Sequence, residues 1–159
     1  MNNRAALFVL SKAYDSLVAT PFCVANYTYD ARIFAGLITG RRDWPLCPVP
    51  GFSIPRLAAA LAHAELKVTH IEGHAERPRF HCAILKEGQH ANFQGFNRAT
   101  HAILEAAILL TRLHLLPREK IDREIAYLAS AVEKTAGPNE REAWSWLIQK
   151  RDAFYSGKT

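Results

Sequence analysis

A largely apolar stretch beginning at Asn97 carries one narrow stripe of polar side chains. The stripe consists of Arg98, His101, Glu105 and Arg112, which fall within an arc of roughly 60° at about 100° per residue of helix. His101 and Glu105 are four residues apart, so the carboxylate can orient the imidazole for proton transfer. Arginines suit phosphate or carboxylate oxygens. We therefore predict catalytic roles for His101 and Glu105, and an anionic ligand held by Asn97, Arg98 and Arg112.

The stripe admits two interpretations, and the residues alone leave both open. It is either the one wet face of an otherwise buried helix, with charges that cancel in water, or a polar lining directed into a protein pocket. From Arg98 to Arg112 the helix rises about 21 Å. The four side chains therefore cannot converge on a single atom.

A second candidate follows the first predicted strand, at Ser11 and Lys12. A hydroxyl, an ammonium group and the N–H groups of a following helix together suit a phosphate. A serine that only caps a helix beginning near Ala13 gives the same pattern. The sequence contains neither GxGxxG nor GxxxxGK[ST], so the usual glycine-rich loops that bind nucleotide phosphates are not expected.

The third candidate closes the next predicted strand, at Asn26, Tyr27 and Asp30. Tyrosine can stack on a flat ring while the neighbouring polar groups bond its edge. The alternative is a turn in which Asp30 caps the following helix.

Seven histidines invite a metal interpretation, but their spacing does not support it. No HExxH motif and no tight His-Cys spacing occurs, so we expect no metal site. His70 with His74, or His81 with His90, could meet across a hairpin.

The overall composition describes one ordinary globular domain. Hydrophobic residues make up 49% of the 159 residues and charged residues 22%, with a net charge of +5. The scattered charge favours anionic ligands weakly and argues against a nucleic-acid partner. Three cysteines without CxxC spacing fit a reducing compartment, and no apolar run approaches a membrane span. We therefore predict a cytoplasmic protein with no membrane partner.

Hydrophobic periodicity and turn residues predict the elements that position these candidates. Strands are expected at 5–10, 22–28, 65–72 and 79–86. Helices are expected at 13–20, 31–39 and 55–63, followed by the helix of the polar stripe and by helices at 117–134 and 139–155. Four prolines and Gly51 predict that 41–55 is irregular. We predict one domain over 1–159, with a sheet part at 1–96 and a helical part at 97–159.

Several segments resemble an uncharacterised flavoprotein-like family, domain of unknown function 447. The resemblance is strongest over 96–144, where Phe96 to Ala99 and His101 to Ile108 carry the family's C-terminal signature. It continues more loosely through Ala25 to Thr28. The resemblance implies an FMN-binding split β-barrel with a C-terminal helical extension, usually a homodimer with the flavin near the subunit interface.

The residue patterns and the resemblance together assign six residues to the cofactor. These are Ser11, Lys12, Tyr14, Asn26, Tyr27 and Asp30. The family's phosphate motif is matched only at Ser11 and Tyr14, because Val9, Leu10 and Ser16 stand where arginine, threonine and asparagine are expected. The resemblance implies that family members have one or two further strands before the segment that matches Leu7 to Leu17.

We accordingly predict an α+β fold, with a reduced split β-barrel-like sheet followed by a C-terminal three-helix segment. The predicted function is a flavin- or pterin-associated redox role, and the family's distribution suggests tetrahydromethanopterin-linked one-carbon metabolism. The alternative is a non-catalytic partner subunit that has lost the flavin site. In either case we expect a homodimer, or a heteromer with a longer homologue, because an incomplete barrel leaves strand edges to cover.

Overall fold

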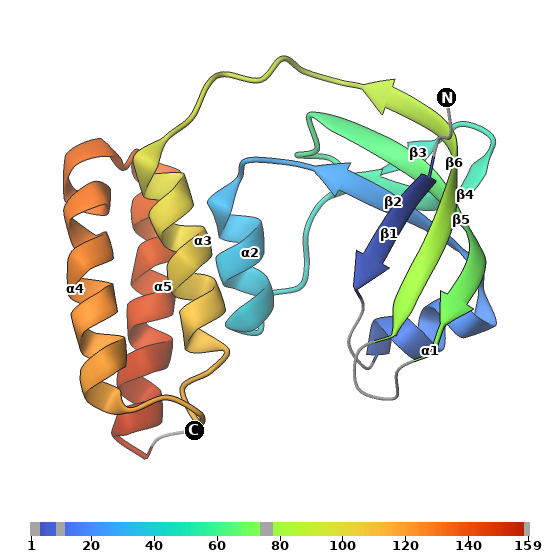
Figure 1. Ribbon diagram of the computed structural model, residues 1–159. Coiled ribbons are helices and arrows are strands. Elements are labelled where there is room, and N and C mark those ends of the chain that lie inside the picture. Colours follow the sequence, from blue (N-terminus) through green and yellow to red (C-terminus); the bar gives the residue numbers. More distant parts are fainter. Residues whose placement is uncertain (1–3, 9–11, 74–77, 158–159) are drawn as a thin grey trace. The chain divides into compact units, whose positions relative to one another are not determined.

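The computed structural model describes residues 4–8, 12–73 and 78–157, with side chains from Tyr14 onward. The chain forms two compact units, a sheet unit (Met1–Thr28 and Pro45–Phe93) and a helical unit (Tyr29–Trp44 and Gln94–Thr159) (Figure 1). The elements are β1 (Arg4–Phe8), α1 (Lys12–Ala19), β2 (Phe22–Tyr27), α2 (Ala31–Ile38), β3 (Leu46–Val49), β4 (Phe52–Leu57), β5 (Ala62–Glu72), β6 (Arg79–Gln89), α3 (Arg98–Leu110), α4 (Arg118–Thr135) and α5 (Pro138–Tyr155). The α+β fold is as predicted.

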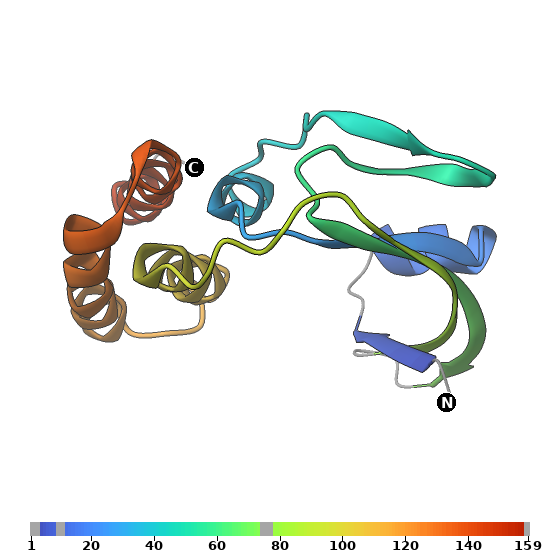
Figure 2. The ribbon, with the colours of Figure 1, turned by 90° about the horizontal axis from the view of Figure 1, so that it is seen from above.

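The sheet unit is built on four antiparallel strands in the order β1-β6-β5-β2. The register of β5 against β6 shifts between Glu65 and Leu66 and again between Val68 and His70. Such irregularities increase the local twist of a strand pair. Figure 2 shows the resulting curl of β5 and β6.

One face of this sheet carries the core of the unit. Ala64 and Leu66 of β5 and Phe80 and Cys82 of β6 are at most 1% exposed, and they pack with Leu17 of α1. Buried residues at the start of β6 alternate with the period of two expected for a strand, whereas His63 to Leu66 of β5 are buried on both faces. Helix α1 therefore covers this face.

The structure corrects the prediction for residues 41–63. Where we expected an irregular segment and then a helix from Pro55, the chain forms the β3–β4 hairpin, and β5 already begins at Ala62. Gly51 adopts a φ of +80° at the hairpin turn, a conformation open to glycine. The two-stranded sheet tolerates its prolines, which lack an N–H group for pairing, because neither strand is central.

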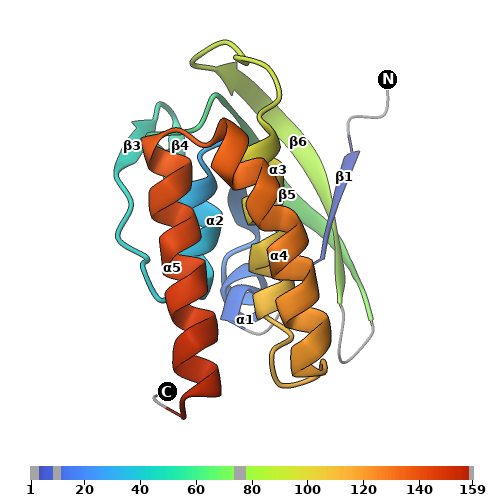
Figure 3. The same ribbon diagram turned by 90° about the vertical axis from the view of Figure 1, so that its left-hand side faces the viewer.

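The helical unit packs α3 against α2, α4 and α5, and Figure 3 shows α4 and α5 in front of α3 and α2. Its core contains Ile103, Ile121 and Leu147, each fully buried, together with Ala35 of α2. The predicted helical part began at residue 97 and did not include α2. In the structure α2 belongs to the helical unit, although its residues lie between two segments of the sheet unit in the sequence. Helix α5 begins at Pro138, one residue before the predicted start, with Gly137 as its N-cap.

Candidate functional site

The seam between α3 and α4 contains a groove of about 610 Å³. His101 and Glu105 contribute to its wall from α3, and Tyr127 does so from α4. The remaining lining residues are Ile108, Leu109, Arg112, Leu116, Lys120, Arg123, Glu124 and Leu128. The polar stripe of α3 thus borders a groove formed within the helical unit.

The stripe itself is open to water. The side chains of His101 and Glu105 are 74% and 52% exposed, and Nε2 of His101 lies 3.8 Å from Oε1 of Glu105. Arg98 and Arg112 are also exposed. These exposures agree with the interpretation of the stripe as a solvent-exposed helix face. Three of its residues, His101, Glu105 and Arg112, also line the groove. A pair at this exposure is screened by solvent and adds little stability.

Three basic residues and two glutamates line the groove. Lys120 lies 4.0 Å from Glu124, whereas neither Arg112 nor Arg123 has a carboxylate within 4.0 Å among the residues that the structure describes. The lining also contains Leu109, Leu116 and Leu128. Guanidinium groups beside leucines suit a ligand that combines an anionic group with an apolar body.

A second hollow of about 590 Å³ adjoins the groove and shares His101, Tyr127 and Leu128 with it. Phe96 in its wall is fully exposed, and Tyr127 is 83% exposed. Asn97 also lines this hollow, but its amide caps α3. Its Oδ1 accepts from the N–H of Ala99 at 2.8 Å, and its Nδ2 donates to the carbonyl of Thr135 at 3.2 Å. Asn97 therefore joins the start of α3 to the end of α4.

The predicted cofactor residues of the sheet unit lie on α1 and at the end of β2, as far as the structure describes them. Ser11 lies outside the described residues, and Lys12 is the first residue of α1. Tyr14 is 38% exposed and meets Phe80 edge to face at 5.6 Å. Tyr27, at the end of β2, is 51% exposed.

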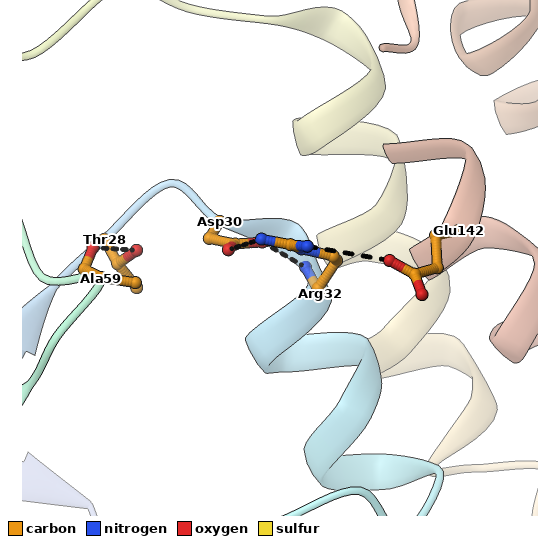
Figure 4. Close-up of polar contacts among 5 residues, drawn as sticks. All are labelled: Thr28, Asp30, Arg32, Ala59 and Glu142. Atoms are coloured by element: carbon orange, nitrogen blue, oxygen red, sulfur yellow. Dashed lines mark hydrogen bonds and ion pairs between the residues drawn. The ribbon is translucent and has the colours of Figure 1, made fainter. Parts of the chain in front are cut away.

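Asn26 has a structural function instead. Its Oδ1 accepts from the N–H of Leu57 at 2.8 Å, and its Nδ2 donates to the carbonyl of Val24 at 3.3 Å. The side chain thereby fastens the end of β4 to β2. Nearby, Thr28 donates to the carbonyl of Ala59 at 3.1 Å (Figure 4).

Asp30 belongs to the helical unit and caps α2, as the alternative interpretation has it. Its Oδ1 accepts from the backbone N–H of Arg32 at 3.1 Å and from Nε of the same residue at 3.0 Å. Its Oδ2 accepts from a terminal guanidinium nitrogen at 2.7 Å, and that guanidinium also lies 3.7 Å from Glu142 of α5 (Figure 4). The cap and the ion pairs hold α2 in place.

Sequence reasoning missed a cluster of ionisable groups in the sheet unit. Nδ1 of His63 lies 2.8 Å from Nε2 of His90, and Nε2 of His63 lies 3.7 Å from Oε1 of Glu65. We predicted a helix over 55–63, which would not place His63 on a strand. In the structure His63 and Glu65 are two residues apart on β5, so their side chains lie on the same face of the sheet. A strand assignment from residue 62 would have predicted that they are neighbours. His90 therefore meets His63, whereas His81 with His90 was one of the two pairs considered from the sequence.

His81 instead lies beside His70, with ring centroids 5.6 Å apart, while His74 lies outside the described residues. Within the described part of the chain, no three histidine, cysteine, aspartate or glutamate residues are placed to hold a metal ion. No helix there is both long and apolar enough to cross a membrane.

Comparisons with known proteins identify the fold. Two family models match, both described as a protein of unknown function, DUF447: the N-terminal domain over residues 2–91 and the C-terminal domain over 97–149. An FMN-bound protein of this family from Methanosarcina mazei is 20% identical, with a TM-score of 0.77 over 92% of this chain and 80% of its own. No curated protein matches significantly.

Two further solved structures resemble the chain over a smaller part. The 2-nitrobenzoate 2-nitroreductase of Pseudomonas fluorescens is 18% identical over 55% of this chain and 48% of its own, with a TM-score of 0.44. An FMN-binding protein from Thermus thermophilus is 14% identical over 58% of each chain, with a TM-score of 0.47. The shared fold therefore rests on the Methanosarcina mazei structure.

Proposed function

Because the chain belongs to the DUF447 family, we propose that it binds FMN through its sheet unit and takes part in a flavin-dependent redox reaction. The observation that carries this proposal is the fold it shares with an FMN-bound member of the family across 92% of the chain. When bound, FMN supplies electron transfer coupled to proton transfer.

The described residues fit FMN in part. The exposed rings of Tyr14 and Tyr27 suit stacking on a flat heterocycle. Asn26 and Asp30 do not fit the predicted role beside the ring, because their polar atoms already bond Leu57 and Arg32. The tyrosines, with Lys12 at the start of α1, are therefore the residues of the predicted set that we assign to the cofactor.

We further assign the α3–α4 groove to an anionic substrate. Arg112 and Arg123 would hold its charged group, while Leu109 and Leu128 would contact its apolar part. His101, paired with Glu105, would exchange a proton with it. A one-carbon substrate remains the expectation drawn from the family resemblance.

We also propose a homodimer, or a heteromer with a longer homologue. Large apolar side chains of the sheet unit remain more than half exposed, among them Val18, Leu46 and Leu85. Exposed apolar surface of this kind favours association with a partner. Light scattering of the purified chain measures its mass, and a monomer at all concentrations would contradict the homodimer and leave only the heteromer. The three free cysteines fit the reducing cytoplasm that we expect.

Titration of FMN into the purified full chain, followed by flavin fluorescence, tests cofactor binding. We expect saturable quenching at micromolar FMN and weaker binding of riboflavin, which lacks the phosphate. Tyr27→Ala should weaken FMN binding about tenfold through lost stacking. The absence of saturable quenching by wild-type protein would exclude the cofactor and favour the non-catalytic partner subunit.

The groove is tested with an anionic aromatic probe, 1-anilinonaphthalene-8-sulfonate, at physiological salt. We expect the double variant Arg112→Gln and Arg123→Gln to bind the probe about tenfold more weakly, because charge-assisted bonds are lost. Arg141→Gln on α5, which does not line the groove, serves as the control. Equal affinity in the double variant and in the control would reject an anion site at Arg112 and Arg123.

A further inference from the structure

Three ionisable side chains of the sheet unit lie in a row that the assigned sites do not use. His63 and Glu65 are two residues apart on β5, and His90 follows β6 directly. The rings of His63 and His90 stack with centroids 4.9 Å apart, and a hydrogen bond of 2.8 Å joins Nδ1 of His63 to Nε2 of His90. On the other side of the His63 ring, Nε2 lies 3.7 Å from Oε1 of Glu65.

The inner two members of this row are buried and incompletely bonded. His63 and Glu65 are each 6% exposed. Nε2 of His63 and Oε1 of Glu65 face each other without a hydrogen-bond partner. Burying such groups unpaired costs folding free energy, which an apolar pair at these positions would avoid. Structural needs alone therefore do not explain these two side chains.

The surrounding strands form a cradle for the His63 ring. Gly88 of β6 lies directly opposite His63, and a Cβ placed there would come within 2.5 Å of Cε1 of the imidazole. Asn26 of β2 lies opposite His63 on the other side, where its side chain is fixed by Leu57. Only a glycine at position 88 leaves the ring room to lie against β6.

We propose that His90, His63 and Glu65 form a proton relay, in which His90 exchanges a proton with a bound substrate or water and Glu65 stores it. A proton arriving at Nδ1 of His90 releases the proton on Nε2 to Nδ1 of His63. The proton on Nε2 of His63 then passes to Glu65, after a small rotation shortens the 3.7 Å gap. Only N–H and O–H bonds break and form, and no group is oxidised or reduced. The three groups together therefore take up one proton.

The surroundings of His90 disfavour a proton that stays at the outer end of the relay. Desolvation, Arg56 of β4 and His63 hold the pKa of His90 below its ordinary value, so an added proton is not retained at His90. Lys86, which pairs with Glu65 in the sheet, is exposed and therefore screened by water. These groups are not placed for a metal ion, since the described residues include no three-ligand cluster.

The relay rests on the proposed redox function, because such a reaction takes up or releases protons. The test of the relay needs no flavin. Nitrogen NMR of the full chain with ¹⁵N-labelled histidine follows the protonation of each ring against pH. We expect Glu65→Gln to lower the titration midpoint of the His63–His90 pair by about one pH unit, because the buried negative charge is removed. A midpoint that stays within about 0.2 pH units of the wild type would overturn the relay.

Two variants complete the test. Glu72→Gln is the matched control, because Glu72 contacts His81 at 3.2 Å on the exposed part of the same strands and also interacts with His70. This variant should leave the titration of His63 and His90 unchanged. If Glu65→Gln does not fold, His90→Gln at the exposed end should remove the coupled proton uptake from His63. An unchanged titration of His63 in that variant would also overturn the relay. Failure to bind FMN would contradict the proposed function while leaving these NMR results in place.

Discussion

Substituting Asp30 distinguishes a residue that holds the fold from one that binds a cofactor. In the structure Asp30 caps α2 and pairs with Arg32 at 2.7 Å, and this guanidinium also approaches Glu142 of α5. The sequence pattern instead predicts that the same carboxylate lies beside the flavin ring. Asp30→Ala removes both the cap and the ion pair, whereas Asp30→Asn keeps one acceptor oxygen for the cap.

The expected loss of stability follows from these contacts. Removing an N-cap costs about 1 kcal/mol. The side chains of Asp30 and Arg32 are 14% and 30% exposed, so their partly screened pair adds about 1 kcal/mol more. We therefore expect Asp30→Ala to lower the free energy of unfolding by about 2 kcal/mol and Asp30→Asn by about 1 kcal/mol.

Urea unfolding followed by circular dichroism measures these differences. Asp43→Ala, at an exposed loop position of the same unit, should change the free energy of unfolding by less than about 0.5 kcal/mol. FMN titrations of the Asp30→Asn protein complete the comparison and should match the wild type. A stable Asp30→Ala protein would refute the cap, and a stable Asp30→Asn protein that binds FMN poorly would return Asp30 to the cofactor.

Three further predictions concern the cores and the titratable groups. Ile103→Ala, at a fully buried position, should lower the free energy of unfolding by about 3 kcal/mol in urea titrations. Ile108→Ala, at a 49% exposed position, should lower it by less than about 1 kcal/mol. Equal losses in the two variants would contradict the assignment of Ile103 to the core. Burial and the neighbouring Cys82 raise the pKa of Cys23 to about 11, so iodoacetamide should modify Cys23 slowly near neutral pH until urea unfolds the chain. Rapid modification of the native protein would contradict this. The pKa of His90 is lowered on folding, mainly by desolvation, so the unfolded chain binds more protons and stability should fall as the pH drops below about 6.5. His90→Gln should reduce this dependence, and an unaltered pH profile would count against it.

Local signals predicted much of the helical unit. Asp30 before an apolar segment indicated the cap of α2, and the periodicity of the last third gave α3, α4 and α5 close to their observed bounds. The hairpin of β3 and β4 was missed because Pro55 suited a helix start as well as a strand outside the sheet centre. The Pro50-Gly51 turn was the better signal.

The candidate site was harder to predict because its contacts are not local. His63 and His90 are separated by 27 residues and meet only through the register of β5 and β6. The polar stripe was visible from helical spacing, but the groove beside it depends on how α4 packs on α3. Asn26 and Asp30 illustrate another difficulty. From the sequence alone, a polar residue that bonds the protein's own backbone cannot be distinguished from one that binds a ligand.

The placement of α2 determines how this protein can be divided. The chain leaves the sheet unit after Thr28, builds α2 among the later helices and re-enters at Pro45, before crossing once more at Phe93. A fragment that starts at Gln94 would lack α2 and expose the apolar residues that α2 covers. Such a piece is expected to aggregate or to associate with a peptide carrying residues 29–44, so the break between the two family models is not a boundary for independent folding.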